Sequence, residues 1–203
     1  MIDKSKIKLL IAIPTVDYNH HLFTESLIKL IQRLSRDGYN FDVRFENGTI
    51  IYMERDNLVR YAAHEGFTHM LWLDSDMVFG DDIVERFIRD DKSFVSCVYV
   101  NRHENHYPVL FDDLKKSHRV DKIPDELFRI EGCGFGGVWM ESKLAIDIMN
   151  QQGTCFTPTP KYGEDLAFCE RLLRYEKELW ADPDILMGHV GYETYWPADY
   201  VNW

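Results

Sequence analysis

Apolar positions in the first half of the chain fall into short runs that are separated by longer stretches of helical period. Four segments have the length and the apolar or alternating pattern of strands: 7–13, 41–45, 69–73 and 94–100. Three segments carry apolar residues at helical spacing: 20–36, 55–64 and 81–89. Gly38 and Gly66 follow the first two of these segments, as is typical of glycine after a helix C-terminus.

This alternation of strands and helices predicts an α/β fold with a mainly parallel central sheet flanked by helices. The second half is less regular. Strands are expected at 107–111, 127–130 and 185–190, and helices at 142–150 and within 163–175, around a glycine-rich stretch at 132–137. No internal repeat or linker divides the sequence, so residues 1–203 are expected to form a single domain.

The charge of the chain narrows the classes of ligand. The formal net charge is -11 at pH 7. Such a chain repels a phosphate backbone, so polymeric nucleic acid is a disfavoured partner, although a modified nucleobase as substrate stays open. An acidic protein that binds an anionic nucleotide needs a cation between the two, which favours a divalent metal.

The cysteines and the N-terminus bear on the cellular compartment. The 4 cysteines form no CxxC pair, which argues against a zinc site and against a disulfide framework. The apolar run near the N-terminus is too short for a membrane span and lacks a small-residue cleavage site. We therefore expect reduced thiols and a cytoplasmic protein without a membrane span, in the host cell if the protein is viral.

The first candidate for chemistry is the segment Asp74, Ser75 and Asp76, which directly follows an apolar strand. In open α/β sheets, ligands bind at the carboxyl ends of the strands. Residues two apart in an extended segment point the same way, and two carboxylates about 4 Å apart repel by roughly 4 kcal/mol at an effective dielectric near 20. A divalent ion resolves that conflict. The alternative is that Asp74 caps a turn while Asp76 is solvated.

Two further positions are candidates for a base and for a metal ligand. Glu164 and Asp165 open a helix, where acidic residues commonly complement the helix dipole, but a positioned carboxylate there can also serve as a general base. His189 lies between Gly188 and Gly191 at the end of the last apolar run. It is either a ligand for a divalent ion or a buried, hydrogen-bonded histidine. The other histidines are expected to be surface or packing residues.

Arg55, Asp56 and Asn57 lie at the expected start of a helix. A helix N-terminus can bind a phosphate or a nucleotide, and the same residues can equally form a capping cluster. Both interpretations stay open.

Four segments in this order resemble the GT-A glycosyltransferases, especially the large nucleotide-sugar family called family two and its short phage-type relatives. The first strand with Pro14 and Thr15 is similar to that family's nucleotide-base loop. The stretch 52–76 is similar to its "ARN…A…LD.D" block, although Asp56 departs from the common pattern. The stretches 163–171 and 182–191 are similar to its "GED..F..R" helix and its late "D P … G H. G" segment.

The resemblance implies a role for each matched residue. Nucleotide-sugar binding falls to about 1–100, and the acceptor side and catalysis to about 101–203. The donor would contact the following residues: Pro14, Thr15, Arg55, Asn57, Asp74, Ser75 and Asp76. Asp165, with Glu164 beside it, would be the base, and Asp74, Asp76 and His189 would bind Mn²⁺ or Mg²⁺. The acceptor side would include Gly134, Phe135, Gly136 and Trp139.

The implied activity is a metal-dependent transfer of a sugar from a nucleotide sugar, with UDP-sugar favoured, to a hydroxyl of an unknown acceptor. Inversion is the expected outcome, and a retaining mechanism stays open. One alternative is a sugar-phosphate nucleotidyltransferase, although those enzymes normally have a glycine-rich loop where this chain has Pro14 and Thr15. A second alternative is a non-catalytic binding module whose aromatic tail, 192–203, stacks on sugar rings.

Overall fold

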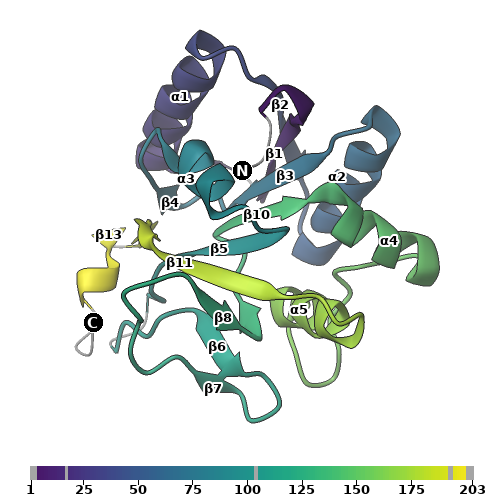
Figure 1. Ribbon diagram of the computed structural model, residues 1–203, viewed down its shortest axis with the longest axis vertical. Helices are drawn as coiled ribbons and strands as arrows, with labels where there is room; N and C mark the ends of the chain where they lie inside the picture. Colours follow the sequence, from purple (N-terminus) through teal and green to yellow (C-terminus); the bar gives the residue numbers. More distant parts are fainter. Residues whose placement is uncertain (1–3, 17, 103–104, 192–193, 200–203) are drawn as a thin grey trace.

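The computed structural model describes residues 4–16, 18–102, 105–191 and 194–199. A seven-stranded sheet forms its centre (Figure 1). In spatial order its strands are β2 (Asn40–Asn47), β1 (Lys8–Thr15), β3 (His69–Leu73), β10 (Gly137–Glu141), β5 (Phe94–Val98), β11 (Leu179–Leu186) and β8 (Phe128–Ile130). Strands β2, β1, β3, β5 and β11 share one direction, and β10 and β8 run against it. The predicted α/β fold with a mainly parallel sheet is confirmed.

Helices cover both faces of this sheet because its strands are apolar on both sides. One face packs against α1 (His21–Arg36) and α3 (Ile83–Asp90). The other face packs against α2 (Ile51–Glu65), α4 (Ser142–Gln152) and α5 (Glu164–Arg174). Alternate residues of β1 divide between the two cores, with Leu9 and Ile11 on the first face and Leu10 and Ala12 on the second.

Two small sheets flank the central one. The first has the order β13 (Thr194–Tyr195), β12 (Gly188–Val190) and β4 (Met77–Val78), and the second has the order β7 (His118–Arg119), β6 (Leu110–Asp113) and β9 (Gly132–Cys133). Single 3-10 turns span Lys4–Lys6 and Pro197–Asp199. No helix among the described residues is both long enough and apolar enough to cross a membrane.

Strand β10 was not predicted, and the strand expected at 185–190 is divided between β11 and β12. Glycine-rich stretches are usually loops, but Gly137 serves packing here. A Cβ at this position would lie 2.2 Å from Sδ of Met187 and 2.6 Å from Sγ of Cys97. Helix α2 begins at Ile51, four residues before the expected start at 55. As a consequence Arg55 and Asp56 lie inside the helix and not at its N-terminus.

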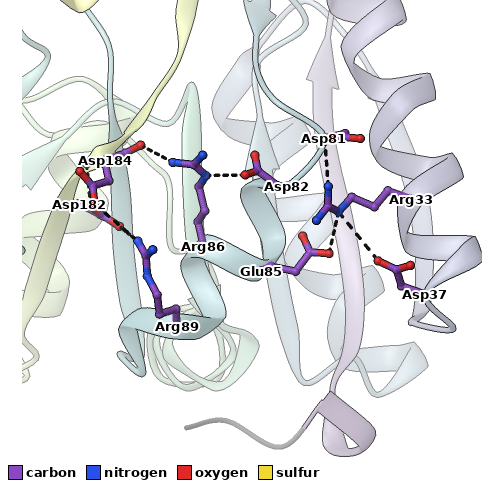
Figure 2. A network of polar contacts seen from close by, with 9 residues as sticks. All are labelled: Arg33, Asp37, Asp81, Asp82, Glu85, Arg86, Arg89, Asp182 and Asp184. Carbon is purple, nitrogen blue, oxygen red and sulfur yellow. Dashed lines mark hydrogen bonds and ion pairs between the residues drawn. The ribbon is translucent and has the colours of Figure 1, made fainter.

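A network of ion pairs joins α1, α3 and β11 on the first face (Figure 2). Arg33 of α1 donates to Glu85 at 3.0 Å and to Asp81 at 3.2 Å. Arg86 of α3 donates to Asp82 at 2.8 Å and to the carbonyl of Asp184 at 2.9 Å. These side chains are partly exposed, so each pair contributes about 0–1 kcal/mol.

At the end of α3, beside this network, the carboxyl groups of Asp90 and Asp182 interact with each other. Burial, followed by the neighbouring charge of Asp182, raises the pKa of Asp90 to about 7, and Arg89 only partly offsets this shift. In the unfolded chain Asp90 ionises near its ordinary pKa of 3.8. The folded protein therefore loses stability as the pH rises from about 4 to about 7, because the unfolded state ionises first.

We expect Asp90→Asn to raise the melting temperature, by more at pH 8 than at pH 5, since asparagine does not ionise beside Asp182. For a chain of this length each kcal/mol corresponds to roughly 2–4 °C. Thermal unfolding at the two pH values measures the effect. Asp125→Asn, at an exposed position, is the matched control and should show no pH-dependent gain. An equal gain at both pH values would contradict the raised pKa.

Candidate active site

Two adjoining cavities lie at the carboxyl ends of β1 and β3. They have volumes of about 550 Å³ and 390 Å³, and they share Ser75, Asp76 and Arg102. The larger cavity is also lined by Tyr18, His20, Val190 and Gly191. The smaller cavity is also lined by Pro14, Thr15, Val16, Gly48, Ile51, Glu54, Asp74 and His189. The structure thus gathers most of the predicted donor residues around one cleft.

Pairing of β12 with β4 places His189 beside Asp76. His189 lies opposite Met77 in this ladder, and the N–H of Val190 donates to the carbonyl of Asp76 at 2.8 Å. Nδ1 of His189 lies 3.0 Å from the carbonyl oxygen of Val100, which favours the tautomer with the proton on Nδ1. Nε2 of His189 then faces Oδ2 of Asp76 at 3.5 Å.

Asp76 and His189 are spaced as two ligands of one divalent cation would be, and the same Oδ2 of Asp76 also faces Nη1 of Arg102 at 3.0 Å. Two ligands about 2 Å from the same ion lie roughly 3 to 3.5 Å apart, and Nδ1 has the second-shell acceptor usual for a metal-binding histidine. Within the described part of the chain, no group of three or more His, Cys, Asp or Glu side chains is arranged to hold a metal. Asp76 and His189 would therefore supply two ligands, and phosphate and water oxygens the remainder, as is common for Mg²⁺.

Asp74 departs from the expectation that it joins this pair. Its Oδ1 accepts a hydrogen bond from Nη2 of Arg55 at 2.9 Å. Burial raises the pKa of Asp74, and Arg55 lowers it in part. For Asp76, burial alone would raise the pKa, but His189 and Arg102 together lower it below the usual value. The two carboxylates of the Asp-Ser-Asp segment thus have different partners and different electrostatic environments.

Arg102 was not identified from the sequence. Its Nη1 lies 3.0 Å from Oδ2 of Asp76 and donates to the carbonyl of Val190 at 3.0 Å. Its side chain is 49% exposed and lines both cavities. The sequence around Arg102 does not indicate that this residue lies at the cleft, because its contacts depend on how β12 pairs with β4.

Arg55 connects Asp74 to Asp165. Its side chain is 1% exposed, and Nη2 lies 2.9 Å from Asp74 and 3.4 Å from Asp165. Its guanidinium also lies over the rings of three aromatic residues, at 5.7 Å from Trp72, 5.2 Å from Phe135 and 5.8 Å from Phe156. Arg55 is therefore a buried positioning residue, and its expected direct contact with the donor is not supported.

Asp165, the expected base, lies beside Arg55 and lines neither cavity. It lies in the first turn of α5, its side chain is 25% exposed, and Oδ2 accepts a hydrogen bond from the N–H of Phe135 at 3.3 Å. Burial raises its pKa to about 7; Arg55 opposes this shift, and the charges of Glu164 and Asp74 add to it. A carboxylate with a pKa near neutrality is suited to accept a proton.

The residues expected on the acceptor side are buried. Trp139 and Phe135 are both 0% exposed, and Trp139 stacks on His69 and Phe87. A Cβ at Gly134 would lie 2.0 Å from the hydroxyl oxygen of Tyr99, and one at Gly136 would lie 3.0 Å from the same ring. The expectation that Trp139 contacts an acceptor is wrong, and these glycines make room for the Tyr99 ring.

Asn57 also departs from its expected place. It is exposed on α2, where it donates to Glu46 at 3.2 Å and accepts from Arg60 at 3.0 Å, and it does not line the cleft. Asp56 is buried and accepts hydrogen bonds from the N–H groups of Cys155 and Phe156. Arg55 and Asp56 are thus engaged in buried contacts within the protein, and none of the residues 55–57 lines the cleft.

His20 was expected to be only a surface or packing residue. It caps α1 by accepting a hydrogen bond from the N–H of Leu22, and it also lines the larger cavity. Residues 192–193 and 200–203 of the aromatic tail lie outside the described residues, so the prediction for the tail is not addressed by the structure.

Comparison with known proteins supports the fold. No family model matches the sequence, and no curated protein matches it. The solved structure of A197 from STIV has a TM-score of 0.63 at 14% identity, over 91% of this chain and 86% of that chain. The catalytic domain of Drosophila beta1,4galactosyltransferase 7, in complex with xylobiose, has a TM-score of 0.55 at 11% identity, over 88% and 66%.

A UDP-glucose pyrophosphorylase complexed with UDP-glucose has a TM-score of 0.52 at 9% identity, over 87% of this chain and 90% of that chain. At these identities the likeness is one of fold alone. The chain has the α/β fold that glycosyltransferases share with sugar nucleotidyltransferases.

Proposed function

We propose that the protein is a glycosyltransferase, which moves a sugar from a nucleoside-diphosphate sugar to a hydroxyl group of an acceptor. The observation that carries the proposal is the link through Arg55 between Asp74, at the cleft, and Asp165, a carboxylate with a pKa of about 7. In a nucleotidyltransferase the attacking group is a phosphate oxygen, which is already ionised. Such an enzyme therefore does not need a base that removes a proton from an acceptor hydroxyl.

In the proposed reaction Asp165 accepts the proton of the acceptor hydroxyl. The hydroxyl oxygen forms a bond to the anomeric carbon while the bond from that carbon to the diphosphate oxygen breaks. Attack from the face opposite the departing group inverts the configuration. Arg102, Asp76 and His189 line the smaller cavity, in which the diphosphate is proposed to bind. A Mn²⁺ or Mg²⁺ ion bound by Asp76 and His189 would stabilise the negative charge of the departing nucleoside diphosphate.

We expect a nucleoside diphosphate to stabilise the protein against heat only when a divalent metal is present. The cleft contains three carboxylates, Asp74, Asp76 and Glu54, so an anionic diphosphate needs a cation there. At about a hundred times its dissociation constant, the ligand should add roughly 2.7 kcal/mol to the free energy of unfolding. Thermal melts with UDP and GDP, each with Mn²⁺ or with a chelator, measure this effect.

His189→Ala should abolish the metal-dependent part of this shift, whereas His118→Ala, at an exposed histidine, should retain it. Equal shifts with Mn²⁺ and with chelator would disprove the metal requirement. An absence of any shift with either nucleotide would disprove the donor class. If the protein instead releases pyrophosphate from a nucleoside triphosphate and a sugar phosphate, and transfers no sugar to an acceptor, it is a sugar-phosphate nucleotidyltransferase.

A further inference from the structure

A third carboxylate, Glu54 of α2, lines the smaller cavity together with Asp74 and Asp76. Its side chain is buried, at 7% exposure. Oε1 accepts a hydrogen bond from the N–H of Ile50 at 3.4 Å. Oε2 is buried and has no hydrogen-bond partner among the residues that the structure describes. An unsatisfied buried carboxylate oxygen is costly, so a ligand that donates a hydrogen bond there gains affinity.

The backbone nearby is shaped around this carboxylate. A Cβ at Gly48 would lie 1.7 Å from Oε1 of Glu54, so only glycine leaves the side chain in this place. Gly48 follows β2 and lines the same cavity. Gly48 and Glu54, from separate segments, together fix one carboxylate at the cavity, with Oε2 left unpaired among the described residues.

Aliphatic side chains line the same cavity. Val16, after β1, is 52% exposed, and Ile51, at the start of α2, is 39% exposed. Exposed aliphatic groups in a cavity of about 390 Å³ suit the faces of a planar ring more than a ribose or a diphosphate. Arg102 and His189 line the same cavity and suit the phosphates of the same ligand.

We propose that Glu54 selects the nucleobase of the donor and that this base is guanine. The inference rests on the proposed function, because it names the nucleotide bound at the same cleft. Guanine presents two adjacent N–H donors, from its ring nitrogen and its amino group, which one carboxylate accepts together. Uracil presents one N–H between two carbonyl oxygens, and these repel a carboxylate. A GDP-sugar donor differs from the UDP-sugar that the sequence resemblance favours.

The test is a calorimetric titration of the protein with GDP and with UDP, both in the presence of Mn²⁺. We expect GDP to bind at least tenfold more tightly than UDP. In Glu54→Gln the side chain presents one acceptor and one donor, which complement uracil. This variant should lose at least tenfold in GDP affinity, with UDP binding as well as GDP or better. Glu46→Gln removes a nearby charge that does not line the cleft and should leave both affinities unchanged.

Other outcomes would contradict the choice of guanine, the contact with the base or the proposed function. Tighter binding of UDP by the wild-type protein would overturn the choice of guanine while leaving the proposed function intact. If 2′-deoxy-GDP loses as much affinity as Glu54→Gln does, the carboxylate binds ribose and the inference fails. If neither nucleotide binds, the proposed function itself fails. Glu54→Asp keeps the charge, so it should keep the preference for GDP even where Glu54→Gln does not fold.

Discussion

Asp165→Asn is expected to lower the rate of glycosyl transfer by roughly a hundredfold to ten-thousandfold, which is the usual worth of a positioned acid or base. Asparagine keeps nearly the same shape and volume but does not accept the proton. It retains an oxygen that can accept the hydrogen bond from the N–H of Phe135. Donor affinity, measured by calorimetry, should stay close to the wild-type value.

A pH–rate profile gives this prediction a second readout. With a pKa of about 7, Asp165 is protonated at lower pH, so the wild-type rate should rise as the pH increases through 7. The variant should lose that rise. Glu164→Gln, in the same helical turn, is the matched control and should keep most of the rate. Near-normal transfer by Asp165→Asn would move the base to Glu164 or indicate a retaining mechanism.

Arg55→Met should destabilise the protein more than most single substitutions. Removal of one partner from a buried ion pair typically costs about 3–5 kcal/mol, because the remaining charges are left uncompensated. Arg55 is 1% exposed and is shared by Asp74 and Asp165. Denaturant unfolding measures the loss. Arg60→Met removes an exposed arginine from the same helix and should change the free energy of unfolding by only about 0.5 kcal/mol.

The loss should depend on pH. Without Arg55 the pKa values of both carboxyl groups rise further above the unfolded value, so stability falls as the pH increases through that range. Arg55→Met should therefore lose less stability at pH 5 than at pH 8. Arg55→Lys retains a positive charge and should lie between wild type and Arg55→Met. A loss independent of pH would mean that Arg55 contributes through its packing against Trp72 and Phe135 instead.

Much of the fold could be predicted because its strands are apolar over consecutive residues. β3 and β5, the two strands that flank β10, are buried throughout, and such a run of apolar residues is recognisable without knowledge of its partners. The helices α1 and α5 were likewise recognisable from their periods. β10 was missed because Gly137 and the glycines before it indicate a loop. In the structure these positions are glycine because the side chains of Met187 and Tyr99 leave no room for a Cβ atom there.

Residues of the candidate site could be identified from the sequence only where they lie at the end of their own strand or helix. Asp76, Asp165 and His189 lie at such ends, and the structure places Asp76 and His189 beside each other. Arg102 and Glu54 depend on contacts between distant segments, so no local pattern reveals them. Arg55 was assigned to the nucleotide because the helix was expected to begin four residues too late.

All of the cysteines are fully buried free thiols, and they come from separate places: Cys97 in β5, Cys133 in β9, Cys155 before α5 and Cys169 within it. Burial raises the pKa of the first three far above the usual range, so little reactive thiolate is present near neutral pH. Alkylating reagents thus reach these sulfurs only when the surrounding structure opens. Thiol modification therefore reports local opening of the two hydrophobic cores without any introduced probe.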